Sequence, residues 1–186
     1  CGGDPEVFKN DLQEMLESIA TTNGCLYTGK TGSCHYLEIG DKRLCVDIGM
    51  EQGRDLFENQ EIPVNAAEID YILLTHAHID HTGLLPMLYA NGFRGQVFAT
   101  KATAELSAIM LRDSAHIQQF EAEWRNRKAK RSGGEPYVPL YTMEDALAAV
   151  RLLIPCDYDK KIKLCDEITI RFTANGSYRC RALNTA

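Results

Sequence analysis

The first part of the chain carries apolar residues at helical spacing. Between residues 4 and 20 they recur three or four positions apart, behind Asp4 as a capping residue and Pro5 in the first turn. This pattern predicts a helix. Because a glycine-containing break follows, we assign residues 1–24 to an N-terminal helical extension of the main domain.

Short apolar runs bounded by turn residues follow, and each predicts a β-strand. The runs are Cys34–Ile39, Arg43–Ile48, Tyr71–Thr75, Gln96–Thr100, Ile162–Leu164 and Ile168–Phe172. Gly40-Asp41-Lys42 separates the first two runs and predicts a hairpin turn. The last two runs lie close together in sequence and predict a closing hairpin.

Helical patterns fall between these strands. They cover residues 81–90, about 102–125 and 142–153, and Thr142 with Asp145 resembles a capping box for the last of them. The segment 126–141 is charged and contains glycine and proline, which predicts a loop. A hairpin followed by alternating strands and helices predicts an α+β fold: a mixed sheet with flanking helices and one functional face at the strand ends.

Length and composition limit the class of protein. A chain of 186 residues with 45% hydrophobic and 25% charged residues fits one folded domain, which we place at residues 25–173, before an irregular tail at 174–186. No apolar run approaches the roughly 18 residues of a membrane span, so we expect no membrane partner. The seven cysteines are odd in number and form no C-x-x-C pair, a pattern typical of reduced thiols in a cytoplasmic protein.

One short segment carries most of the candidate chemistry. It follows the strand that ends at Thr75 and supplies three imidazoles and one carboxylate within six positions: His76, His78, Asp80 and His81. These side-chain types suit Zn²⁺, with iron or manganese as alternatives. Alternate residues of an extended segment point the same way, so His76 and His78 can share one ion, which leaves Asp80 and His81 for a second.

The H-x-H-x-D-H pattern after an apolar strand resembles the second motif of the metallo-β-lactamase superfamily, and Asp47 before Gly49 matches the first. Within that superfamily the chain is most similar to the β-CASP group of RNA- and DNA-processing nucleases. The stretches that carry this resemblance are Thr31–Cys34, Asp47–Gly53, Leu74–Pro86 and Gly92–Gly95. It implies a four-layer αββα sandwich, two zinc ions that activate water, and a phosphodiester substrate, with RNA as the expected partner.

The resemblance also implies roles for individual residues. Asp47 is expected to orient the metal loop through hydrogen bonds without binding an ion, although it could instead merely end a strand. Asp80 is the candidate catalytic carboxylate in addition to being a metal ligand. A thioesterase or glyoxalase-like hydrolase on the same fold is an alternative, but such enzymes tend to lack the stretches at residues 31–34 and 49–53.

The resemblance is incomplete in the last part of the chain. The family's full site needs a further histidine and then a bridging aspartate, but His116 is the last histidine, and Ala174-Asn175-Gly176-Ser177 stands where the next motif is expected. Each ion would keep two protein ligands instead of the usual three, so we expect weak metal binding by this chain alone. A truncated, catalytically inactive protein is therefore an alternative. The sheet face left open could be covered by another chain, by the tail or not at all, and the first of these makes a homo-oligomer an open alternative.

Five cations follow the long helix near the single tryptophan, Trp124: Arg125, Arg127, Lys128, Lys130 and Arg131. The formal net charge of −6 argues against a general attraction to nucleic acid, so these residues are the candidate phosphate contacts. The alternative is a solvated loop at a helix C-terminus, where cations are favoured in any case. His35 and His116 have no ligand partner nearby in sequence and are predicted to be structural.

Overall fold

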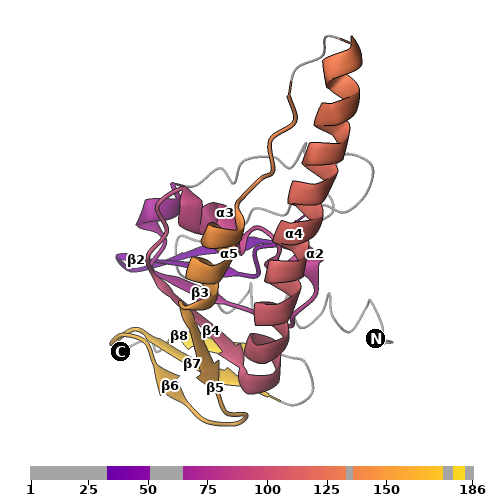
Figure 1. Ribbon diagram of the computed structural model, residues 1–186. Coiled ribbons are helices and arrows are strands. Elements are labelled where there is room, and N and C mark those ends of the chain that lie inside the picture. The colour runs from indigo at the N-terminus through magenta and orange to yellow at the C-terminus, as the bar shows by residue number, and fades with distance from the viewer. Residues whose placement is uncertain (1–32, 51–64, 133–135, 174–177, 183–186) are drawn as a thin grey trace, which may run out of the picture.

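The computed structural model describes residues 33–50, 65–132, 136–173 and 178–182. Its central element is a five-stranded sheet with the order β1-β2-β3-β4-β5 (Figure 1). The strands are β1 (His35–Ile39), β2 (Lys42–Val46), β3 (Tyr71–Leu73), β4 (Gln96–Thr100) and β5 (Leu153–Cys156). The β1–β2 pair is antiparallel and the other neighbouring pairs are parallel, which confirms the predicted hairpin and mixed sheet. The predicted extension at residues 1–24 lies outside the described residues.

Helices cover one face of this sheet. They are α3 (Leu85–Ala90), α4 (Lys101–Ser132) and α5 (Met143–Val150). Leu111 of α4 and Ala146 of α5 share one buried core with Ile72 of β3. The predicted capping box is present, because the Thr142 hydroxyl accepts from the Asp145 amide while the Asp145 carboxylate accepts from the Thr142 amide.

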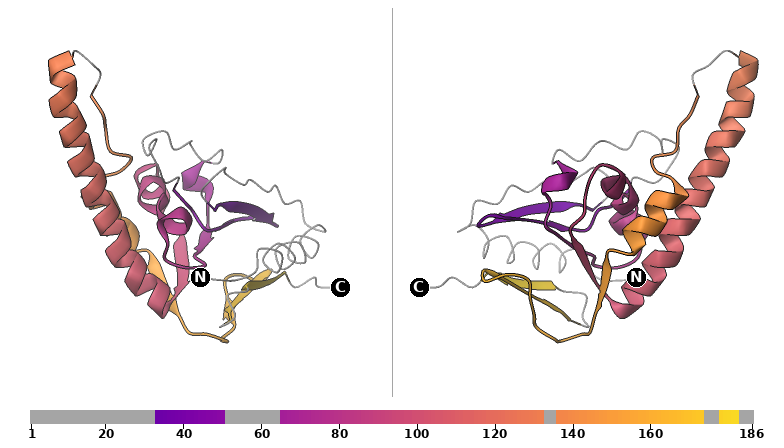
Figure 2. Two further views of the ribbon diagram at one scale, coloured as in Figure 1. Left: turned by 90° about the vertical axis from the view of Figure 1, so that its right-hand side faces the viewer. Right: turned by 60° about the vertical axis from the view of Figure 1, so that its left-hand side comes forward.

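The opposite face of the sheet packs against a second, smaller sheet. β6 (Ile162–Lys163), β7 (Ile168–Phe172) and β8 (Tyr178–Ala182) pair antiparallel, and they lie at the bottom of Figure 1 and Figure 2. Ile168 and Phe172 of β7 share a buried core with Leu44 and Leu73 of the larger sheet. The predicted α+β class with flanking helices is confirmed, and three of the four expected layers lie within the described residues.

Three segments differ from the sequence-based predictions. Residues 126–132 continue α4 instead of forming a loop, since arginine, lysine and alanine are good helix formers. Leu153–Cys156 forms a strand where the predicted helix was to end, and its Pro155 is tolerated because β5 lies at the sheet edge. Residues 178–182, expected to be irregular, form β8 alongside β7.

Two general expectations can be compared with the described part of the chain. No helix within it has the length and apolar composition needed to cross a membrane. Cys34, Cys45, Cys156 and Cys165 within it are free thiols. This state agrees with the reduced cysteines that their spacing predicts.

Candidate metal centre

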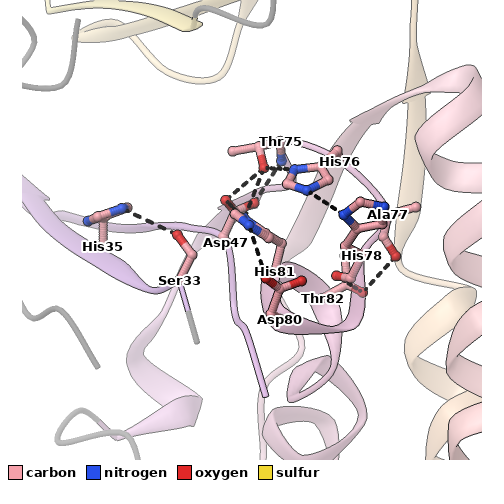
Figure 3. A network of polar contacts seen from close by, with 10 residues as sticks. All are labelled: Ser33, His35, Asp47, Thr75, His76, Ala77, His78, Asp80, His81 and Thr82. Atoms are coloured by element: carbon pink, nitrogen blue, oxygen red, sulfur yellow. Dashed lines mark hydrogen bonds and ion pairs between the residues drawn. The ribbon is translucent and has the colours of Figure 1, made fainter. Parts of the chain in front are cut away.

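The candidate centre begins where two neighbouring parallel strands end. β2 and β3 are adjacent, and their carboxyl ends lead toward Asp47 and Thr75. Asp47 has a left-handed backbone conformation with φ of 59°, which aspartate tolerates better than most residues. Its amide donates to the carbonyl of Leu73 at 2.9 Å. This turn directs the Asp47 carboxylate toward the histidine segment (Figure 3).

The Asp47 carboxylate is the anchor of the site. Only 1% of its side chain is exposed, and it accepts three hydrogen bonds of 2.7 Å each, from the Thr75 amide, the Thr75 hydroxyl and Nδ1 of His81. A buried carboxylate is costly unless such donors satisfy it. These donors meet that requirement, and they tie the start and the end of the histidine segment to one group. The orienting role expected for Asp47 agrees with this geometry.

Backbone hydrogen bonds hold the segment from another side. The amide of Ser33 donates to the carbonyl of Asp80 at 2.8 Å. The amide of Ile48 donates to the carbonyl of His81 over the same distance. Between them lies Gly49, where an added Cβ atom would stand 1.8 Å from the Asp80 carbonyl oxygen. The close approach of these two backbones therefore requires glycine at position 49.

Hydrogen bonding also assigns the free nitrogen of two imidazoles. Thr75 donates its single hydroxyl proton to Asp47, so Nδ1 of His76, 2.8 Å from the same oxygen, must donate to it. A carboxylate can only accept, so Nδ1 of His81 carries a proton as well. In their neutral forms, His76 and His81 therefore present an unprotonated Nε2, the form that binds metal ions.

The ligand atoms form two neighbouring pairs. Nε2 of His76 and Nδ1 of His78 lie 3.2 Å apart, close to the ~3.3 Å expected for two nitrogens that bind one tetrahedral zinc ion. Nε2 of His81 lies 3.7 Å from a carboxylate oxygen of Asp80. The rings of His76 and His81 have centroids 3.9 Å apart, which brings the two pairs side by side.

Burial and neighbouring charges shift the pKa values of His81 and His76 in opposite directions. Burial lowers the pKa of His81, but the hydrogen bond and charge of Asp47, with the charge of Asp80, outweigh it and raise the pKa above its usual value of 6.5. Burial, and then the neighbouring His81, lowers the pKa of His76. Because metal ions bind neutral imidazole, an ion at His81 competes with a more tightly held proton than one at His76.

The side chains of the two ligand pairs suit zinc. Neither pair alone completes the coordination sphere of an ion. Among the described residues, no three His, Cys, Asp or Glu side chains are arranged to hold one ion together. Catalytic zinc sites usually have three protein ligands. Each pair therefore needs one further donor before it forms such a site.

The cluster of cations lies apart from the histidines. It occupies the C-terminal end of α4, which projects beyond the sheet, whereas the histidine segment contacts α4 nearer its middle through α2 (Ile79–Thr82) (Figure 1). Arg125 pairs with Glu121 at 2.6 Å, and Nζ of Lys128 lies 3.7 Å from the ring centroid of Trp124. The candidate phosphate contacts and the candidate metal ligands are thus separate features of the surface.

Three residues complete the centre although the metal-ligand pattern does not single them out. Thr75 connects Asp47 to His76, the Ser33 amide donates to the Asp80 carbonyl, and Gly49 leaves room for the Asp80 backbone. Ser33 and Gly49 belong to stretches that carry the family resemblance, which was the available signal for them.

His35 lies beside Ser33, with the nearest nitrogen and oxygen of the two side chains 3.4 Å apart. Its side chain is buried, and burial lowers its pKa. Its Nδ1 has no hydrogen-bond partner among the described atoms. His116 is exposed on α4. Neither histidine belongs to the two pairs of candidate ligands.

Comparison with known proteins agrees with this geometry. Residues 27–93 match the model of the metallo-beta-lactamase superfamily. Ribonuclease TTHA0252 of Thermus thermophilus is 36% identical over 135 residues, which are 72% of this chain and 27% of that protein. Transcription termination factor FttA of Methanosarcina mazei is 28% identical over an alignment of 195 positions, which covers 90% of this chain and 28% of that factor. The chain spans about a quarter of the length of these relatives.

Two solved structures are also similar. MEM-A1, a subclass B3 metallo-beta-lactamase from a soil metagenome library, aligns with a TM-score of 0.47 and 17% identity over 86% of this chain and 55% of that chain. A metallo-beta-lactamase superfamily protein of Sulfolobus tokodaii aligns with a TM-score of 0.41 and 17% identity over 84% and 56%. The family model itself spans Asp47 and the whole histidine segment. Residues 27–93 of this chain are therefore similar to the metallo-β-lactamase superfamily.

Proposed function

We propose that this chain provides the metal loop of a metal-dependent hydrolase that cleaves phosphodiester bonds in RNA. The observation that carries the proposal is the spacing of the two ligand pairs, with Nε2 of His76 and Nδ1 of His78 only 3.2 Å apart. The superfamily match supports hydrolysis, and the ribonuclease among the relatives supports an RNA substrate and the narrower resemblance to β-CASP nucleases.

Each residue of the loop has a defined task in this proposal. His76 and His78 would hold one ion, and Asp80 with His81 a second; zinc is our choice, with iron or manganese as alternatives. When bound, zinc activates water at neutral pH and offsets negative charge on phosphate oxygens. Asp47 keeps the proton of His81 on Nδ1, which leaves Nε2 of His81 as the ligand atom. Asp80, whose side chain is 43% exposed, is the catalytic carboxylate we propose at the rim.

One structural observation favours a second candidate function. The described residues hold no third ligand for either pair. A protein that binds RNA through this fold without turnover is therefore the competing proposal.

Two further assignments belong to the proposal. The cations at the end of α4, Arg125, Arg127, Lys128, Lys130 and Arg131, are the candidate contacts to RNA phosphates. We place the protein in the cytoplasm, because Cys34, Cys45, Cys156 and Cys165 are free thiols.

Incubation of labelled single-stranded RNA with the protein and zinc, manganese or iron, against a chelator control, tests this function. We expect metal-dependent cleavage that the double variant His76→Ala/His78→Ala abolishes and that His116→Ala retains. His116 is a matched control because it is an exposed histidine on α4, outside the centre. Cleavage of a thioester in place of RNA, or RNA binding without any turnover, would overturn the proposal.

A further inference from the structure

The outer side of α4 carries a second apolar stripe. Its members are Leu106, Ile109, Ile117, Phe120 and Trp124, with exposed fractions between 46% for Trp124 and 61% for Phe120. Steps of three, four or eight residues keep side chains on one side of a helix with 3.6 residues per turn. The side chains that α4 buries, such as Leu111, Ala115 and Gln118, fall on the opposite side.

An apolar outer stripe is unusual for a surface helix, whose outer side is normally polar. Figure 2 shows α4 along the edge of the molecule in both views, with one side turned away from the two sheets. The segment after α4 returns along its inner side, where the Leu140 amide donates to Gln118 at 3.1 Å. Apart from Lys128 over the ring of Trp124, the described residues therefore leave the stripe open, and open apolar stripes of this kind mark interaction surfaces.

Two charged residues within the stripe indicate which partner fits it. Asp113 lies midway between Ile109 and Ile117, and Arg127 follows Trp124 by three residues, so both fall on the stripe. Both are exposed, and neither forms an ion pair with another described residue.

Their positions are symmetric about Phe120, seven residues away on either side. An antiparallel pair of α4 helices centred on Phe120 would therefore place Asp113 of each copy beside Arg127 of the other. The same register brings Ile117 of one copy next to Trp124 of its partner.

We propose that this stripe is a self-association surface, on which α4 of a second copy packs antiparallel with Phe120 at the two-fold axis. Such an interface must be self-complementary, and an apolar centre with opposite charges at equal distances meets that condition. The shared apolar contact is on the order of 1,000 Å², near the lower limit for specific interfaces, so the dimer is expected to depend on concentration. The stripe does not involve the histidine segment, so its test is separate from that of metal-dependent cleavage. It shares only Arg127 with the candidate phosphate contacts.

Analytical ultracentrifugation over a concentration series tests the surface. The wild-type chain is expected to dimerise as concentration rises, and Phe120→Glu to weaken association by about 100-fold. Leu147→Glu is the matched control, because Leu147 is 40% exposed on α5 and lies outside the stripe. This control is expected to behave as the wild type. A wild-type chain that stays monomeric, or an equal effect of Leu147→Glu, would overturn the proposal.

Charge reversal tests the register. Asp113→Arg and Arg127→Asp each place like charges at both ends of the dimer, and each is expected to weaken association by about 10-fold. Mixing the two single variants restores both opposite-charge contacts and should restore association, whereas each variant alone should remain weak. Circular dichroism of each variant verifies that α4 stays folded. Failure of the mixture to associate, with both variants folded, would exclude the antiparallel register.

Discussion

The two ligand pairs are held in different ways, at an anchored end around His81 and at an exposed end around His78. His81 has only 17% of its side chain exposed, and its Nδ1 is fixed by Asp47. His78 is exposed, and its imidazole contacts only His76 among the described side chains. The anchored end is thus fixed by folding itself, whereas the exposed end would gain a fixed geometry only with an ion bound. Stability and metal affinity should therefore depend on different residues.

The anchored end should carry the largest effect on stability. Asp47→Ala removes the acceptor of three hydrogen bonds and leaves an alanine at a φ of 59°. We expect a loss of about 3–4 kcal/mol in the free energy of unfolding, measured by urea denaturation of the metal-free protein. Asp47→Asn tolerates the backbone conformation and keeps one acceptor, so it should lose clearly less. Equal losses for the two variants would contradict the anchoring role.

A steric test of the same end uses Gly49. Its replacement by alanine forces a Cβ atom against the Asp80 carbonyl oxygen, and we expect a loss of about 2–3 kcal/mol in unfolding free energy. Gly92→Ala is the comparison, since a Cβ atom there meets only Ala67 at 3.5 Å, although φ is 103°. That variant should lose about 1 kcal/mol. If Gly49→Ala lost less stability than Gly92→Ala, the close approach of Gly49 to Asp80 would be unimportant for stability.

From the sequence, the candidate ligand residues of this site could be predicted better than the contacts that hold them in place. The H-x-H-x-D-H pattern indicates the candidate ligand residues, and β4 was predicted with its observed bounds around the apolar run Val97–Ala99. The contact of Ser33 and Gly49 with Asp80 joins segments that are distant in sequence, which local patterns do not record. The strand at Leu153–Cys156 was also missed, because its pairing with β4 decides its conformation.

Substitutions at the exposed end should affect metal binding and leave the stability of the metal-free protein almost unchanged. In the metal-free protein, His76→Ala/His78→Ala is expected to change the free energy of unfolding by no more than about 0.5 kcal/mol, since His78 is exposed and His76 is half-buried. The same denaturation experiment with added zinc should stabilise the wild type and leave the double variant unchanged. A large loss of stability in the metal-free double variant would contradict the distinction between the anchored and the exposed end.

The smallest expected effect is a change in the titration of single histidines, measured by NMR on the metal-free protein. His81 should titrate above pH 6.5 and His76 below it. A raised pKa in the folded state means that the Asp47–His81 contact stabilises the fold fully below pH 6.5, and that this contribution is lost as pH rises through the folded pKa. In Asp47→Asn the pKa of His81 should fall. An unchanged His81 titration in that variant would show that Asp47 does not hold its proton.

The most direct test of the metal loop is the zinc content of the purified protein by mass spectrometry. We predict zinc in the wild type and in His116→Ala, and its loss in the folded double variant His76→Ala/His78→Ala. A wild type that stays free of zinc, iron and manganese when each is supplied would contradict the assignment of this loop as a metal-binding site.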